Sequence, residues 1–273
     1  MAEVPATEPV FVSPWATPEP VVPAAPAKPT RPSALTEAFW GLVSTLLLAG
    51  WIALWAGWLA ALALVAGVFV HEFGHMMVIN RLGCGPSRIR IIPFFGGAAT
   101  LQRAPESDIK GVLIALAGPA FGLVAAVPFF LLAWQTGKPG WLAGAFSVGA
   151  LNLINLAPAA PLDGAKALGP ALQRVHPMFE RVIVTAVALA GLAWALERGS
   201  WLFGAVIGFG ALRAFAAGGA RPPARPLSAL EWPASVGLYL VVVGACAAVT
   251  LFAAHGAGIG LRQFSFSGFG AAR

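Results

Sequence analysis

The chain has 273 residues, of which 58% are hydrophobic and only 10% are charged, with a formal net charge of +6. An ordinary soluble domain carries about 25% charged residues, so a soluble protein of this size could not cover its surface with this composition. These values exclude a soluble enzyme and, over most of the chain, intrinsic disorder. They indicate a polytopic helical membrane protein.

The beginning of the chain differs from the rest, because nine of the 23 prolines fall within the first 35 residues. Proline interrupts helices and removes a backbone donor, so we predict a disordered, Pro-rich tail over residues 1–35. We expect a membrane domain over residues 36–256, with its core at 58–170. A Gly-rich tail at 257–273 completes the predicted organisation.

Long apolar runs predict an all-α fold with six to seven transmembrane helices. The run 38–79 is about twice as long as the ~20 residues that one spanning helix needs, and we split it near Ala56–Trp58. The other predicted spans are 109–134, 141–157, 180–197, 201–217 and 235–254.

A polar segment at 81–108 separates the second and third predicted spans. It contains a run of alternating Arg and Ile residues at 88–92 and a Gly-rich run at 93–101. Two short runs of this kind predict a small β-hairpin. Arginines surround it, so we expect the hairpin on the cytoplasmic face.

The distribution of positive charge predicts the topology. If the N-terminus is cytoplasmic, 13 of the 17 Lys and Arg residues fall on the cytoplasmic side. The positive-inside rule favours that orientation, and the Ala-, Gly- and Arg-rich composition is typical of a bacterial protein. We therefore expect a multi-pass protein of the bacterial inner (plasma) membrane, with the lipid bilayer and no nucleic acid as a partner.

The segment His71-Glu72-Phe73-Gly74-His75 holds two of the four histidines of the chain. On a helix, residues i and i+4 lie on one face, so the two imidazoles could bind one Zn²⁺ ion. The neighbouring Glu72 could then act as general base on a metal-bound water. The apolar run 58–70 places this motif at the end of a membrane helix, where ionisable groups are costly and usually functional.

A catalytic zinc site needs a third protein ligand and an open position for water. Asp163 is the preferred candidate, because it follows a span that is broken by Pro158 and Pro161. Zinc, Asp163, Glu72, two neutral imidazoles and a water carry no net charge, which suits a buried site. The alternative is that Asp163 only caps a helix or forms a turn before Gly164. The other candidate ligands are His176, His255, Glu106 and Asp108.

The His-Glu-x-x-His motif and the segment Asn155-Leu-Ala-Pro-Ala-Ala-Pro-Leu-Asp-Gly164 together resemble the site-2 protease family of intramembrane zinc metalloproteases, peptidase family M50. The resemblance covers about residues 58–170. It implies that one zinc ion per chain is bound by His71, His75 and Asp163, and that Glu72 is the general base. It also implies a substrate-binding region, which includes a strand edge; the residues concerned are Asn155, Phe95, Gly96 and Gly97.

The function implied by this resemblance is intramembrane cleavage of the transmembrane segments of membrane proteins (regulated intramembrane proteolysis). Many relatives carry PDZ or CBS domains, and no insertion of that size fits here, so a separate membrane partner could supply regulation. A secondary transporter is an alternative, because broken helices and buried ionisable groups also mark ion paths. A catalytically inactive scaffold of the same fold is a further alternative, whereas a di-iron oxygenase would need more histidines.

Overall fold

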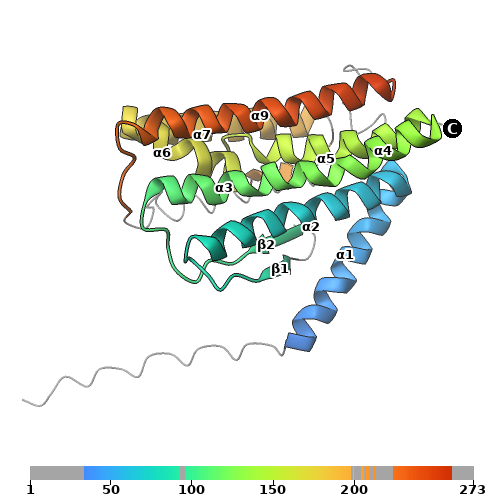
Figure 1. Cartoon of the computed structure of the whole chain (residues 1–273), viewed down its shortest axis with the longest axis horizontal. Helices are drawn as coiled ribbons and strands as arrows, with labels where there is room; N and C mark the ends of the chain where they lie inside the picture. The colour runs from blue at the N-terminus through green and yellow to red at the C-terminus, as the bar shows by residue number, and fades with distance from the viewer. Residues whose placement is uncertain are drawn as a thin grey trace, which may run out of the picture. The chain divides into compact units, whose positions relative to one another are not determined.

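The computed structural model describes residues 34–92, 96–197, 199, 204–205, 207–208, 212 and 224–259. The expected tails therefore lie largely outside the described residues, as do Phe95 and most of the predicted span 201–217. The described helices, shown in Figure 1, are α1 (Ala34–Ala56), α2 (Trp58–Arg81), α3 (Asp108–Gly122), α4 (Val127–Thr136), α5 (Leu142–Asn155), α6 (Asp163–Val175), α7 (Pro177–Glu197) and α9 (Glu231–Gly256). Two 3₁₀ turns, η1 (Leu123–Ala126) and η2 (Pro139–Trp141), flank α4.

The long apolar run 38–79 forms two helices, α1 and α2, as the sequence predicts. They meet at Gly57, which has a φ of 84°. That backbone conformation is open to glycine at no steric cost and is unfavourable for residues with a Cβ atom. The break between α1 and α2 therefore lies at a residue whose backbone conformation favours glycine.

The next predicted span, 109–134, corresponds to a nearly continuous helical segment. It consists of α3, η1 and α4 and extends from Asp108 to Thr136. Pro119 lies inside α3, and a second proline stands in the first turn of α4. The segment nevertheless stays long and apolar enough to cross a bilayer.

Four described segments meet the length and hydropathy needed to cross a membrane: Trp58–Arg81, Asp108–Thr136, Met178–Glu197 and Glu231–Gly256. They confirm the predicted class, a helical membrane protein. Helix α5 has only 14 residues, about 21 Å of helix, which is less than the ~30 Å hydrocarbon core. The predicted total of six to seven transmembrane helices stays a prediction.

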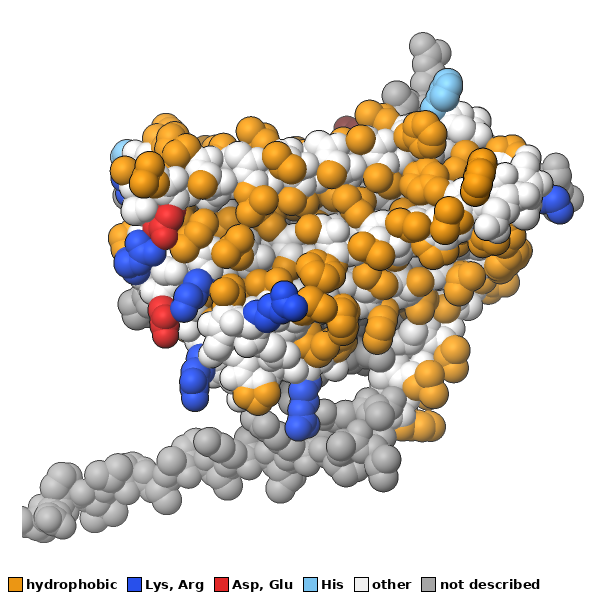
Figure 2. All heavy atoms as spheres, in the orientation of Figure 1, with side chains coloured by type: hydrophobic (Ala, Val, Ile, Leu, Met, Phe, Trp, Pro, Cys, Tyr) orange, Lys and Arg blue, Asp and Glu red, His pale blue; other side chains and the backbone are white. Residues whose placement is uncertain are grey.

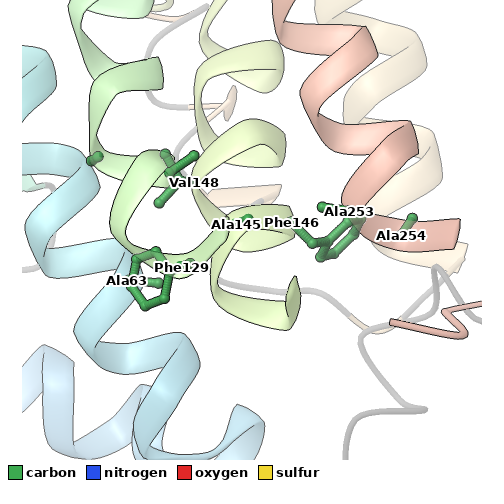
Figure 3. Packing of buried hydrophobic residues seen from close by; sticks show 9 residues of the cluster. Ala63, Phe129, Ala145, Phe146, Val148, Ala253 and Ala254 are labelled. Atoms are coloured by element: carbon green, nitrogen blue, oxygen red, sulfur yellow. The ribbon is translucent and has the colours of Figure 1, made fainter. Parts of the chain in front are cut away.

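The helices α2, α3, α5 and α9 form the body that positions the candidate site. Helix α2 packs against both α3 and α5, and α5 packs along α9. Figure 3 shows a cluster of buried hydrophobic side chains contributed by α2, α4, α5 and α9: Ala63, Phe129, Ala145, Phe146, Val148, Ala253 and Ala254. Small residues let helix backbones approach closely, which is how helices associate inside membranes.

A strand pair lies beside α2, in the segment for which a hairpin is predicted. Strand β1 (Ile89–Ile92) pairs antiparallel with β2 (Gly96–Ala99), in a register that places Ile89 opposite Ala99 and Ile92 opposite Gly96. Strand β2 is also in contact with α2. The hairpin therefore brings a backbone edge close to the helix that carries the histidines.

The surface is divided between apolar and charged regions. Figure 2 shows hydrophobic side chains along the helices, while most visible charged side chains gather at the end that holds the hairpin and the beginning of α3. Large apolar side chains such as Leu54 and Trp134 are 87% and 81% exposed. Exposure of this kind suits contact with lipid, as expected for an integral membrane protein.

Candidate metal centre

The two motif histidines lie on one face of α2, as their spacing predicts. His71 and His75 are both buried, and their ring centroids are 4.8 Å apart. The i, i+4 spacing alone places both residues on this face, because about one helical turn separates them. The face becomes a site only where other elements bring further polar atoms to it.

The third polar group comes from α6. The Oδ2 atom of Asp163 lies 3.0 Å from the Nε2 atom of His71 and 3.0 Å from that of His75. The two Nε2 atoms are 3.1 Å apart. Among the described residues, these three form the one group of His, Cys, Asp and Glu side chains whose ligand atoms could hold a metal ion together.

The hydrogen bonds on the far side of each ring fix the protonation of the imidazoles. The Nδ1 atom of His75 lies 2.7 Å from the carbonyl oxygen of Ile114, and that of His71 lies 2.9 Å from the Oδ1 atom of Asn152. Both partners are acceptors, so both Nδ1 atoms carry a proton. In neutral imidazoles the Nε2 atoms are then unprotonated, and their lone pairs point at each other and at the carboxylate of Asp163.

This arrangement fits a divalent metal ion. Two Nε2 lone pairs and a carboxylate oxygen about 3 Å apart repel one another unless a positive charge lies between them. A tetrahedral zinc ion, with bonds of about 2.0–2.1 Å, separates its ligand atoms by about 3.3 Å, close to the distances found here. The residues therefore could hold zinc, as two neutral histidines and one carboxylate.

The other oxygen of Asp163 forms an ion pair. The Nζ atom of Lys166 donates to Oδ1 at 2.9 Å, and its side chain is 64% exposed. Burial favours the neutral acid, but the Lys166 ammonium holds the pKa of Asp163 well below its usual range. Asp163 is therefore a carboxylate, and its charge in turn raises the pKa of Lys166.

The side chain of Asp163 does not cap its own helix. Helix α6 begins at Asp163, its N-cap is Leu162, and no side-chain hydrogen bond caps this end. The capping alternative therefore lacks the contact that would define it, whereas both carboxylate oxygens have partners in the site.

Glu72 is buried beside the His pair, and its carboxylate is not one of the three converging ligand groups. Its Oε2 atom accepts a hydrogen bond of 2.8 Å from the backbone N–H of Ala99 in β2. The predicted base is thus in contact with β2, the strand that contains Gly96 and Gly97 of the predicted substrate edge.

The other predicted residues lie on α5, on β2 or outside the described residues. Asn155, at the end of α5, donates to the carbonyl of Leu151. Gly96 and Gly97 belong to β2. The alternative ligands His176 and His255 are exposed at helix ends, and Glu106 pairs with Lys110.

Two close neighbours of the site are not among the predicted site residues. Asn152 contacts His71, and Gly118 of α3 lies where a Cβ atom would be 2.3 Å from the Nε2 atom of His75. A sequence signal existed for Asn152, because it is a polar residue inside an apolar span. For Gly118 no local signal separates close approach to a site from ordinary helix packing.

Fold and site together define a class: a polytopic helical membrane protein whose core holds a candidate metal centre of two His and one Asp beside a Glu. Residues 59–138 match the model of Peptidase family M50. The resemblance to this family that the motifs indicate is thereby confirmed for residues 59–138, which contain both histidines.

Two named relatives agree with that family. Over 119 residues the chain is 34% identical to "Putative zinc metalloprotease sll0528" of Synechocystis sp. (strain ATCC 27184 / PCC 6803 / Kazusa). This match covers 41% of this chain and 31% of that protein. Over 124 residues it is 32% identical to "Putative zinc metalloprotease Rip3" of Mycobacterium tuberculosis, with 42% of this chain and 31% of that protein covered. The chain thus matches about a third of the length of these relatives.

Proposed function

We propose that this protein is an intramembrane zinc endopeptidase that cleaves transmembrane segments of other membrane proteins. The observation that carries the proposal is the convergence of two Nε2 lone pairs and the Asp163 carboxylate, next to buried Glu72, among apolar helices. The match to Peptidase family M50 supports it, as do relatives that are named zinc metalloproteases.

The residues divide into holding and reacting groups. A zinc ion held by His71, His75 and Asp163 would polarise the scissile carbonyl and lower the pKa of a bound water. The carboxylate of Glu72 would accept the proton of the attacking water and deliver it to the nitrogen of the cleaved peptide bond. Its position next to His71 in the chain keeps it within the same turn of α2.

The substrate must lose helical structure at the cleaved bond, because an amide inside a helix is occupied by its own hydrogen bonds. The edge of β2 that faces α2 offers a backbone that could pair with an extended segment. In this proposal Gly96 and Gly97 belong to that edge, Phe95 precedes it, and Asn155 contributes from the end of α5.

We further propose that the protein resides in a bacterial inner membrane with a cytoplasmic N-terminus, and that a membrane partner regulates it. The positive-charge bias supports the orientation. The gathering of charged side chains at the end that holds the hairpin agrees with a cytoplasmic location of that end (Figure 2).

The test is cleavage of a model transmembrane substrate by purified protein in detergent, together with its zinc content. We expect about one zinc per chain and cleavage by the wild type. Glu72→Gln should keep its zinc, because Glu72 is not a ligand, and should lose activity by about 10²–10⁴-fold.

A matched control is Glu106→Gln, because the exposed Glu106 side chain pairs with Lys110 at the beginning of α3 and is not part of the candidate site. It should cleave like the wild type. Cleavage by Glu72→Gln within tenfold of the wild type would mean that another group moves the proton. Zinc-loaded wild type without cleavage of any transmembrane substrate would favour the inactive scaffold instead.

A further inference from the structure

We infer that Asn152 is a positioning residue of the candidate metal centre: its amide sets the tautomer and the orientation of the His71 imidazole. The inference rests on the proposed metal centre. Asn152 lies on α5 and is fully buried, with 0% of its surface exposed. It is a polar side chain in an otherwise apolar helix, so its burial requires that its hydrogen bonds be satisfied.

Both ends of the Asn152 amide are used. The Nδ2 atom donates to the carbonyl oxygen of Val148 at 2.9 Å, and the Oδ1 atom lies 2.9 Å from the Nδ1 atom of His71. A carbonyl can only accept, so the amide nitrogen must face Val148 and the amide oxygen must face His71. The opposite orientation would bring two oxygens together without a proton.

The fixed amide decides the state of the histidine. An acceptor at Nδ1 requires the proton of neutral His71 to be on Nδ1, which leaves the Nε2 lone pair for the metal. The same bond also limits rotation of the ring. Asn152 therefore does for His71 what the carbonyl of Ile114 does for His75.

Gly122 on α3 makes room for this contact. A Cβ atom at Gly122 would lie 2.1 Å from the Oδ1 atom of Asn152, and its nearest neighbours would all be atoms of that amide. Close packing of α3 on α5 thus depends on a glycine directly beneath the bond to His71. Asn155, one turn further along α5, donates to Leu151 instead.

The first experiment measures the zinc dissociation constant of the full chain in detergent by competition with a chelator. Asn152→Leu keeps the branched shape of the side chain but cannot accept a hydrogen bond, and we expect zinc to bind about 10–100-fold more weakly. Ser147→Ala is the matched control, since the hydroxyl of Ser147 on the same helix donates to the Ala143 carbonyl and not to a histidine. Zinc affinity of Asn152→Leu within threefold of the wild type would overturn the inference.

A second measurement separates positioning from packing. Histidine-selective ¹⁵N NMR of the metal-free protein should show His71 protonated at Nδ1 in the wild type and in Ser147→Ala. Asn152→Leu should show a mixture of tautomers. An unchanged tautomer in Asn152→Leu would assign Asn152 to packing alone.

Gly122→Ala provides an independent route that leaves Asn152 and His71 in place. Its methyl group should displace the amide and weaken zinc binding by a similar factor. In the Asn152→Ala background the same methyl should have no further effect, because the atoms that it would meet are gone. Additive effects of the two changes would contradict the inference.

These outcomes are distinct from those of the proposed function. Zinc binding that depends on Asn152, in a protein that cleaves no substrate, would contradict the proteolytic activity and support the positioning role. Wild-type protein with no zinc affinity would contradict the metal centre and this inference with it.

Discussion

Gly118 is the residue of α3 that most directly limits the candidate metal centre. A Cβ atom there would lie 2.3 Å from the Nε2 atom of His75 and 2.6 Å from that of His71. Both rings are held on their other side by hydrogen bonds to Ile114 and Asn152. The imidazoles therefore cannot move away without losing those bonds.

We expect Gly118→Ala to weaken zinc binding by at least about tenfold, since the displaced rings lose their supporting hydrogen bonds. Gly111→Ala on the same helix is the control, because a Cβ atom there meets nothing within 4 Å. The measurement is zinc affinity by chelator competition. Equal affinities of the two variants would show that the site tolerates a methyl group at Gly118.

Asp163→Asn tests the ligand that comes from furthest away in the chain. A neutral amide is a poorer zinc ligand than a carboxylate, and it leaves the positive charges of the metal and Lys166 without their counter-ion. We expect loss of zinc and of cleavage. If Asp163 only began a helix, the change would be nearly neutral, because Asn suits a helix N-terminus about as well as Asp.

At the scale of elements, the contact between α2 and β2 connects the candidate base to the candidate substrate edge. The N–H of Thr100 bonds to Arg88 on the β1 side, whereas the N–H of the preceding Ala99 bonds to Glu72. The backbone N–H groups of successive residues in a strand point to opposite edges of that strand. One edge of β2 therefore pairs with β1, and the other edge faces the candidate site.

We expect Ala99→Pro to lower cleavage by at least about tenfold, because proline lacks the N–H that orients the Glu72 carboxylate. Zinc content should not change, since no ligand is touched. Ala99→Gly keeps the N–H and should stay close to the wild type. Full activity of Ala99→Pro would show that this hydrogen bond has no part in the reaction.

Helix α9 connects the elements at the scale of the whole molecule. The hydroxyl of Tyr239 donates to the Leu156 carbonyl at 2.7 Å, just before the turn that leads to Asp163. Trp232 donates to the Ala171 carbonyl of α6 at 3.0 Å. Helix α9 thus holds the end of α5 and the helix of the Asp163 carboxylate in one packed body.

The membrane orientation is also a property of the whole molecule. The segment from Asp108 to Thr136 is long enough to cross the bilayer, so Arg103 and Lys138 should lie on opposite sides. A reporter fused after Arg103 should be cytoplasmic and one fused after Lys138 external, as the charge bias predicts. The reverse result would mean that the proposed orientation is inverted. If both reporters lay on the same side of the membrane, the segment from Asp108 to Thr136 would not cross it.

Composition and local spacing were sufficient for several properties of this protein. The membrane class follows from few charges and long apolar runs, and the shared face of His71 and His75 follows from one turn of helix. The break at Gly57 and the positions of most helices are likewise determined by residues that are close together in the sequence. Each of these depends on residues that are near neighbours in the chain.

Only the tertiary structure decided which polar atoms meet. Asp163 reaches the two histidines because α6 packs against α3, and the tautomer of His71 depends on Asn152 of α5. The sequence alone left Asp163 with two interpretations and assigned no role to Asn152. Contacts between distant segments depend on how helix faces pack against one another, and the periodicity of a single helix carries no information about its neighbours.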